Sequence, residues 1–273
     1  MFIRQKDSSQ SKIDLRTVGK IIVSTGRGGT GKSTFVALFT KYINSHSILL
    51  IDLDPDESLA DMLGVDLEKE GKKTVSEVLY DIIEENKRIG RTAYKSLPGL
   101  LEHMIQNGDC LYKDRKFDLI SLGKKLSVGC YCEADETIKG AIPELVKNYN
   151  EIVIDSPAGL EHLNRKITPD IDDLFVILDP SEKSTKHIER IKYVVKGVKI
   201  SYKHFYLVGN YRFTEETEEY LRNTGETYLG KIDYDTNVKA YNLNRKSLLE
   251  LPQNSPASLS VRKILAKAGY EIV

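Results

Sequence analysis

The chain has 273 residues, 40% of them hydrophobic, and its 40 basic and 40 acidic side chains give a formal net charge of zero. This length suits one large α/β domain, and the neutral balance gives no support for a nucleic-acid or anionic-membrane partner. Three cysteines argue against a disulfide framework. Without an apolar leader or a run of about 18 apolar residues, we expect a cytoplasmic protein that binds neither membrane nor nucleic acid.

Short apolar runs alternate with helix-like stretches along the chain, after a flexible tail at 1–15. Strands are predicted at 20–24, 47–52, 117–121, 151–155, 173–178 and 204–209, and helices at 32–44, 74–86, 97–106, 136–147 and 255–268. Such runs suit strands buried on both faces, and the alternation indicates a mostly parallel central sheet with helices on both faces. We predict one α/β three-layer sandwich over 16–273, with 64–97 as the best candidate for an insertion or a mobile region.

A glycine-rich segment directly after the first predicted strand carries the clearest functional signal. Residues 26–33 fit G-x-x-x-x-G-K-[ST] between a strand and a helix, which is the setting that a P-loop requires. Backbone N–H groups close around phosphates there, and the helix N-terminus adds positive charge. We expect Lys32 to reach the β- and γ-phosphates of ATP and Ser33 to coordinate Mg²⁺. The predicted phosphate-binding residues are Gly26, Arg27, Gly28, Gly29, Thr30, Gly31, Lys32, Ser33 and Thr34.

Two further strand ends carry carboxylates. Asp52 and Asp54 follow one apolar run, and Asp155 ends another. A carboxylate at the carboxyl end of a strand beside a P-loop lies where Mg²⁺ and its waters bind. A lone aspartate in this position is more often a helix cap, but two such strand ends in one P-loop chain favour a magnesium site.

Two of the three cysteines, Cys130 and Cys132, flank Tyr131 in the segment SVGCYCEADE. A disulfide between them would be strained. Two thiolates can bind a soft metal ion, but they leave a tetrahedral site half empty. The alternative is that both are buried packing residues. Cys110 stands alone, and we interpret it as structural or incidental.

These motifs together resemble a known family. The basic residue after Gly26, the IDLDP strand end at 51–55 and the DSPAG turn at 155–159 resemble the deviant Walker A ATPases of the SIMIBI class, which include MinD, ParA and the nitrogenase iron protein. The GCYC segment at 129–132 resembles the CooC-type accessory ATPases of nickel carbon monoxide dehydrogenase. The resemblance spans most of residues 20–268 and implies a P-loop NTPase fold.

The resemblance also implies roles for single residues. Asp54 would orient the attacking water, and Asp52 and Asp155 would hold the magnesium shell, largely through water. Gly159 would offer its N–H to the γ-phosphate. Asn210, in YLVGNYR at 206–212, would read the adenine base, and an ordinary turn asparagine is the alternative.

Arg27 departs from the family pattern, in which a signature lysine after the first glycine reaches the nucleotide of the partner subunit. Arginine keeps the charge and adds a planar, bidentate grip on phosphate. We therefore expect Arg27 to join Lys32 and Asp54 in catalysis, in cis or in trans. A solvent-facing loop arginine is the alternative reading.

The function that the resemblance implies is ATP hydrolysis to ADP and phosphate, slow without a partner, in a homodimer that forms on ATP binding. Two copies of Cys130 and Cys132 would supply four thiolates for Ni²⁺ or Zn²⁺. The predicted client is a carbon monoxide dehydrogenase-type metalloenzyme that receives nickel. Two alternatives stay open: a MinD/ParA-like positioning ATPase on a membrane or DNA, and an iron–sulfur carrier ATPase, although such carriers usually have Cys-x-x-Cys.

Overall fold

The computed structural model describes residues 19–88, 104–105, 108–124, 132–159 and 170–273. An eight-stranded sheet runs through them in the order β3-β4-β2-β5-β1-β6-β7-β8. Neighbouring strands are parallel except for β3 and β4, which are antiparallel. The strands are β1 (Lys20–Gly26), β2 (Ile48–Asp52), β3 (Tyr112–Lys113), β4 (Asp118–Ser121), β5 (Glu151–Asp155), β6 (Asp170–Leu178), β7 (Ser201–Gly209) and β8 (Thr227–Lys231).

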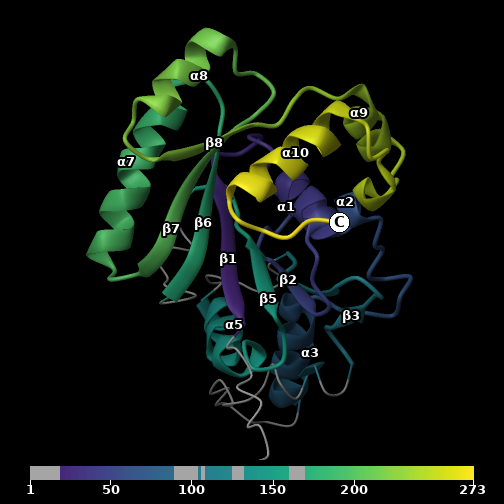
Figure 1. Ribbon diagram of the computed structural model, residues 1–273. Helices are drawn as coiled ribbons and strands as arrows, with labels where there is room; N and C mark the ends of the chain where they lie inside the picture. The colour runs from purple at the N-terminus through teal and green to yellow at the C-terminus, as the bar shows by residue number, and fades with distance from the viewer. Residues whose placement is uncertain (1–18, 89–103, 106–107, 125–131, 160–169) are drawn as a thin grey trace, which may run out of the picture.

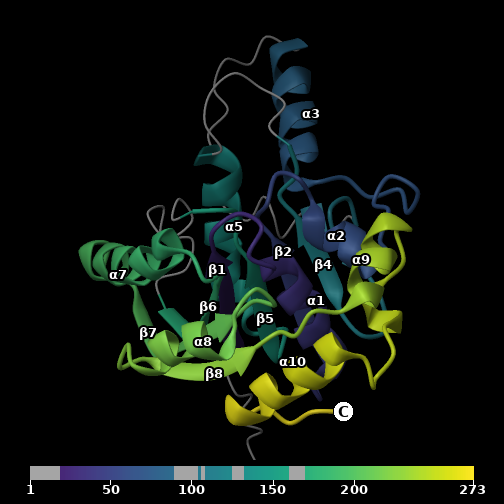
Figure 2. The ribbon, with the colours of Figure 1, turned by 90° about the horizontal axis from the view of Figure 1, so that it is seen from above.

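Helices cover both faces of the sheet (Figures 1 and 2). They are α1 (Lys32–Tyr42), α2 (Ser58–Leu63), α3 (Val75–Arg88), α5 (Cys132–Leu145), α7 (Glu182–Gly197), α8 (Glu215–Arg222), α9 (Thr236–Leu243), the 3₁₀ turn η1 (Leu248–Glu250) and α10 (Pro256–Lys267). Side chains of α1, α2 and α10 pack on one face, and those of α3, α5 and α7 pack on the other. The predicted three-layer α/β sandwich is confirmed.

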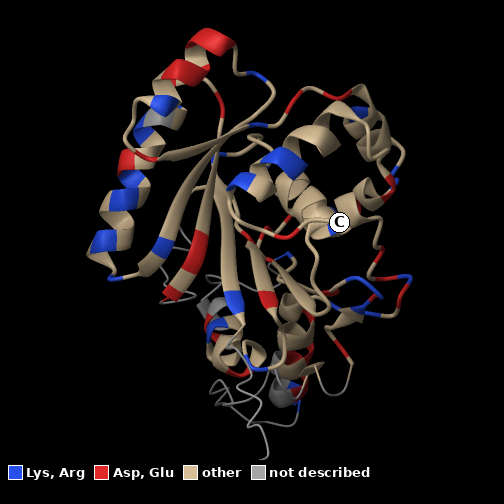
Figure 3. Ribbon diagram, viewed as in Figure 1, with Lys and Arg blue, Asp and Glu red and all other residues tan. Residues whose placement is uncertain are grey.

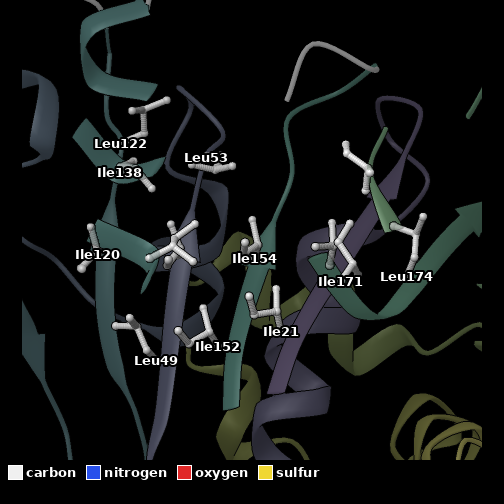
Figure 4. Packing of buried hydrophobic residues seen from close by; sticks show 14 of the residues in the cluster. Ile21, Leu49, Leu53, Ile120, Leu122, Ile138, Ile152, Ile154, Ile171 and Leu174 are labelled. Atoms are coloured by element: carbon white, nitrogen blue, oxygen red, sulfur yellow. The ribbon is translucent and has the colours of Figure 1, made fainter. Parts of the chain in front are cut away.

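Alternate residues of the central strands feed these two cores. Ile21 and Val23 point to the α3, α5 and α7 side, whereas Ile22 points to the side of α1 and α10. Figure 4 shows the first cluster, in which Leu49, Ile152 and Ile21 lie side by side on the neighbouring strands β2, β5 and β1. Because successive side chains of a strand point to opposite faces, strands buried on both sides read as continuous apolar runs. This is the pattern from which the sheet was predicted.

Several predicted boundaries differ from the structure. The first helix ends at Tyr42 rather than at residue 44, because Ile43 is extended and bridges Ile272. The helix predicted at 136–147 runs from Cys132 to Leu145. The last two predicted strands begin earlier, at Asp170 and Ser201, because mostly polar residues precede the continuous apolar run of each strand. The tail at 1–15 and most of the helix predicted at 97–106 lie outside the described residues.

The C-terminal helix α10 belongs to the core. Val261, Ile264 and Leu265 are at most 1% exposed, and they pack with α1 on one face of the sheet. The apolar side of this helix is therefore used within the fold. Over the described ranges, no helix is long and apolar enough to cross a membrane.

Candidate functional site: a nucleotide-binding site

The segment between β1 and α1 forms a phosphate-binding loop whose glycines are required by geometry. Gly26 has a φ of 152°, and a Cβ atom there would lie 2.3 Å from the carbonyl oxygen of Ile177 on the neighbouring strand. Gly31 has a φ of 100°, and a Cβ atom there would meet nothing within 4 Å. The first glycine therefore allows close strand packing, whereas the second leaves open space above the start of α1.

The start of α1 is suited to an anion. No side chain of the described residues caps the helix at Gly31, so its first N–H groups are available to a ligand. Thr30 closes the loop from within by donating to the carbonyl oxygen of Arg27 at 2.8 Å. Lys32 is 6% exposed, with its Nζ atom 3.5 Å from the same oxygen. The predicted P-loop residues thus surround one anion-binding corner.

Two aspartates lie side by side next to this corner, because β2 and β5 are neighbouring strands and Asp52 pairs in register with Asp155. Both are fully buried. Burial raises the pKa of Asp52 well above its usual value, Asp155 raises it further, and two backbone N–H groups oppose the shift. Burial raises the pKa of Asp155 to about 7, against the nearby Ser33 hydroxyl and the Lys32 ammonium. Two buried carboxylates side by side favour a bound cation.

The partners of these two aspartates differ. The carboxylate of Asp52 accepts the N–H groups of Asp54 at 3.0 Å and of Leu59 at 3.1 Å, and so it holds the loop after β2. Neither oxygen of Asp155 has a hydrogen-bond partner among the described residues, although the Ser33 hydroxyl is close enough to lower its pKa. A buried carboxylate without a partner is rare unless an ion or water serves it.

The donor set fits Mg²⁺, which prefers carboxylate, hydroxyl and water oxygens. Ser33 and Asp155 would hold the ion, with Asp52 behind them. When bound, Mg²⁺ neutralises charge on the β- and γ-phosphates. Asp54, half-buried, borders the cavity described below, within the loop where a water could be oriented. The N–H of Gly159 points to the carbonyl oxygen of Gly26 at 3.5 Å, so its predicted contact with a γ-phosphate stays a prediction.

Arg27 has a partner within its own chain. Its guanidinium donates to the Ser181 hydroxyl at 3.2 Å, and Ser181 caps α7 by accepting the N–H of Ser184. Asp179 accepts from Ser181 as well, and these hydrogen bonds and Arg27 lower the pKa of Asp179 against its burial. Ser181 lies 154 residues from Arg27 along the chain, and no local sequence pattern predicts this contact.

A cavity of ≈ 840 Å³ opens in front of the P-loop, within the size range of small-molecule sites. Asn210 lies in its wall, 3% exposed. Its side-chain oxygen accepts the N–H of Arg212 at 3.0 Å, but its Nδ2 atom has no partner among the described residues. The structure thus brings the P-loop, Asp54 and Asn210 to one cavity. Tyr211 and Tyr234 line it too, and both were missed from sequence.

A family model described as an AAA domain matches residues 18–205. The chain belongs to this AAA-domain family. The uncharacterized ATP-binding protein MJ0685 of Methanocaldococcus jannaschii is 32% identical over 254 residues, which cover 90% of this chain and 97% of that protein. The carbon monoxide dehydrogenase accessory protein CooC of Rhodospirillum rubrum is 24% identical over 233 residues, covering 80% of this chain and 85% of CooC.

Solved structures agree on the fold of this AAA-domain protein. The MinD cell division protein of Aquifex aeolicus superposes with a TM-score of 0.62 at 20% identity, covering 92% of this chain and 96% of that one. The cell division ATPase MinD of Pyrococcus furiosus gives 0.63 at 18% identity, with coverages of 92% and 98%. The MinD/ParA-like P-loop fold is therefore shown, and with the family's P-loop it makes the protein an ATPase.

The predicted metal-binding cysteines cannot be placed as a pair. Cys130 lies outside the described residues, and Cys132 is the first residue of α5. Among the residues that can be described, no three or more His, Cys, Asp or Glu side chains are grouped so as to hold a metal ion. Cys110 is buried, and burial raises the pKa of its thiol to about 12, so the reactive thiolate form is disfavoured at neutral pH.

Proposed function

We propose that this ATPase dimerises on binding ATP, holds Ni²⁺ or Zn²⁺ as cargo between the Cys130 and Cys132 thiolates of two copies, and assists nickel insertion into a carbon monoxide dehydrogenase-type enzyme. Closing the dimer completes the metal site, and hydrolysis opens it and releases the ion. The ATP site and the metal site are thus coupled, because binding at either site stabilises the same closed dimer.

The observation that carries this proposal is where the cysteine segment leaves the fold. Ser121, the last residue of β4, pairs in register with Asp52. The next residue, Leu122, donates its N–H to the carbonyl oxygen of Asp52 at 2.8 Å. The chain that carries Cys130 therefore leaves the same edge of the sheet as the magnesium carboxylates. The start of the segment that carries Cys130 is therefore joined by a backbone hydrogen bond to Asp52, which lies beside the nucleotide site.

Coordination chemistry supports two copies rather than one. Two thiolates per chain fill half of a tetrahedral site, and a two-fold axis supplies the other half from identical residues. The similarity to CooC, at 24% identity, supports the same class of client. A MinD/ParA-like membrane switch has less support, because the apolar side chains of α10 are buried in the core.

The decisive experiment compares the double variant Cys130→Ser/Cys132→Ser with Cys110→Ala, which removes the isolated buried thiol. Both are made in an Asp54→Ala background, which we expect to bind ATP without hydrolysing it. Metal content after loading with Ni²⁺ or Zn²⁺ and mass by light scattering are measured with and without ATP. We expect one ion per dimer with ATP in the Cys110→Ala control and none in the double variant.

Unchanged metal content in the double variant would remove the cargo part of the proposal and leave the ATPase. A brown, cluster-type absorption after anaerobic reconstitution with iron and sulfide would instead favour the iron–sulfur carrier. Co-sedimentation with liposomes or DNA in the presence of ATP would favour the positioning ATPase.

A further inference from the structure

Two serines extend the pair of buried aspartates into a row of four polar side chains across the sheet. Asp52 on β2 and Asp155 on β5 pair in register. Ser121 on β4 pairs with the first of these aspartates, and Ser24 on β1 pairs with the second. Neighbouring strands lie about 4.8 Å apart. The row therefore places one serine on the outer side of each aspartate.

This row faces α1, the helix that begins at the P-loop. The residues two positions earlier in the same four strands belong to the core on the α1 side of the sheet: Leu119, Leu50, Val153 and Ile22. Residues two apart on a strand point to the same face. The four polar side chains therefore form a floor below the start of α1, where Ser33 lies close enough to lower the pKa of Asp155.

Most oxygen atoms of this floor have no partner within the protein. All four residues are at most 1% exposed. The hydroxyls of Ser24 and Ser121 and both oxygens of Asp155 lack a hydrogen-bond partner in the part of the chain that the structure describes. Asp52, in contrast, accepts two backbone N–H groups. Because buried polar atoms are rarely left unpaired, neighbouring orphans in one row point to a shared set of bound waters.

The coordination chemistry of Mg²⁺ explains why such waters would gather here. The ion requires an octahedral shell of oxygens and keeps several of its waters, since it loses them reluctantly. Ser33 and Asp155 supply only part of that shell. Each bound water needs an acceptor for its hydrogens, and a serine hydroxyl both accepts and donates. Ser24 lies beside Asp155, within reach of such a water, whereas Ser121 is one strand further from the ion than Asp52.

We propose that Ser24 and Ser121 are positioning residues of the magnesium site, whose hydroxyls hold the waters that link the ion to Asp155 and Asp52. Neither serine contacts the ion or the nucleotide. Ser24 acts on a water of the ion itself, and Ser121 holds the far end of the water row, where β4 ends. This inference goes beyond the proposed function, because it rests on the magnesium site of the ATPase and not on the cysteines.

The test measures how tightly Mn²⁺, a paramagnetic substitute for Mg²⁺, binds to the protein loaded with ADP, from the EPR signal of the free ion. The variants are Ser24→Ala, Ser121→Ala and their double. Thr25→Val is the matched control: Thr25 is buried and its hydroxyl is unpartnered among the described residues, but it shares the opposite face of the sheet with Val23. Affinity for ADP in EDTA and thermal unfolding are measured for every variant.

We expect the double alanine variant to bind Mn²⁺ roughly tenfold more weakly, as loss of groups behind a metal's ligands typically does. Its affinity for ADP in EDTA should stay unchanged, because the serines act only through the ion. Thr25→Val should bind Mn²⁺ like the wild type. In an Asp155→Asn background the serine changes should weaken Mn²⁺ binding much less, since the waters that they hold no longer lead to a carboxylate.

Unchanged Mn²⁺ affinity in the double variant, or an equal loss in Thr25→Val, would overturn the role of the two serines. A wild-type protein that binds no Mn²⁺ together with ADP would instead refute the magnesium site on which this inference rests. Neither result touches the proposed cargo metal, because its test depends on Cys130 and Cys132.

Discussion

Two buried aspartates on strands that flank β1 behave in opposite ways. Asp155, at the carboxyl end of β5, has no hydrogen-bond partner among the described residues for either oxygen. Asp173, in the amino-terminal half of β6, meets the Lys20 ammonium at 2.5 Å and the His204 ring at 2.7 Å, and it accepts from the Tyr270 hydroxyl. Figure 3 shows acidic residues on this half of β6 beside a basic residue at the start of β1.

The difference separates a structural carboxylate from a functional one. Burying a charge is tolerated when ion pairs and hydrogen bonds serve it, and Asp173 meets that condition while tying the C-terminal Tyr270 to the sheet. Asp155 meets it only when a ligand brings a cation. Equal burial therefore says little about role, and the partners of each oxygen decide it.

The largest expected effect comes from replacing Asp155, the functional aspartate of the two. In Asp155→Asn, ATP turnover should fall on the order of a hundredfold or more, because the magnesium that neutralises phosphate charge is held less well. Without nucleotide, the free energy of unfolding should not fall, since the variant removes a carboxylate whose pKa burial raises. Steady-state hydrolysis of ATP measures the loss of turnover, and urea unfolding without nucleotide measures the stability.

Asp155→Asn would contradict this assignment if it lost stability without nucleotide and kept its turnover. Asp56→Ala is a suitable control for turnover, because Asp56 is exposed in the same part of the cavity wall. It should hydrolyse ATP like the wild type.

The structural side of the comparison gives the next effect. Asp173→Asn removes the charge that Lys20 and His204 share, and we expect a loss of about 3 kcal/mol in the free energy of unfolding. Turnover per folded molecule should stay unchanged, because Asp173 does not border the nucleotide cavity. Urea unfolding without nucleotide measures the loss of stability. Titration of the active sites gives the concentration of folded enzyme, by which the measured turnover is divided. A stable variant with impaired turnover would reverse the two roles.

This contrast also shows how far the sequence can be read. The P-loop, Asp52 and Asp155 were predictable because each is coded locally, by a glycine pattern or by a carboxylate that ends an apolar run. The partners of Asp173 could not be predicted, because Tyr270 reaches it across 97 residues of sequence. A sequence shows which charge is buried in a strand but not what lies beside it.

The missed elements have a common physical cause. The edge strand β8 buries only Leu229 fully along its length, so it lacks the apolar run that marks the central strands. Because β8 was not predicted, α9 and Tyr234 were also missed from the sequence, although Tyr234 borders the cavity. Arg27 was identified, but its contact with Ser181 spans 154 residues and depends on β1 lying next to β6.

The smallest expected effect concerns a buried histidine near the P-loop. His187 is 5% exposed, and its Nε2 atom has no partner in the described ranges. Burial lowers its pKa, and the cations Arg27, Arg190 and Lys32 lower it further. Below about pH 6.5, the usual pKa of histidine, His187 binds a proton in the unfolded chain but stays neutral in the folded protein. The unfolded state then holds more protons, so stability must fall as pH drops.

Replacing His187 by a side chain that does not titrate isolates this contribution. Between pH 7.5 and pH 5, wild-type protein should lose more unfolding free energy than His187→Gln, and His187→Leu should follow the glutamine variant despite its different packing. Unfolding in urea at both pH values measures the slopes. Equal slopes in all three proteins would mean that the fold accepts the proton, and that the positive charge around the P-loop is weaker than the structure implies. A steeper wild-type slope would show that burial and the cations Arg27, Arg190 and Lys32 keep the His187 ring neutral in the folded protein.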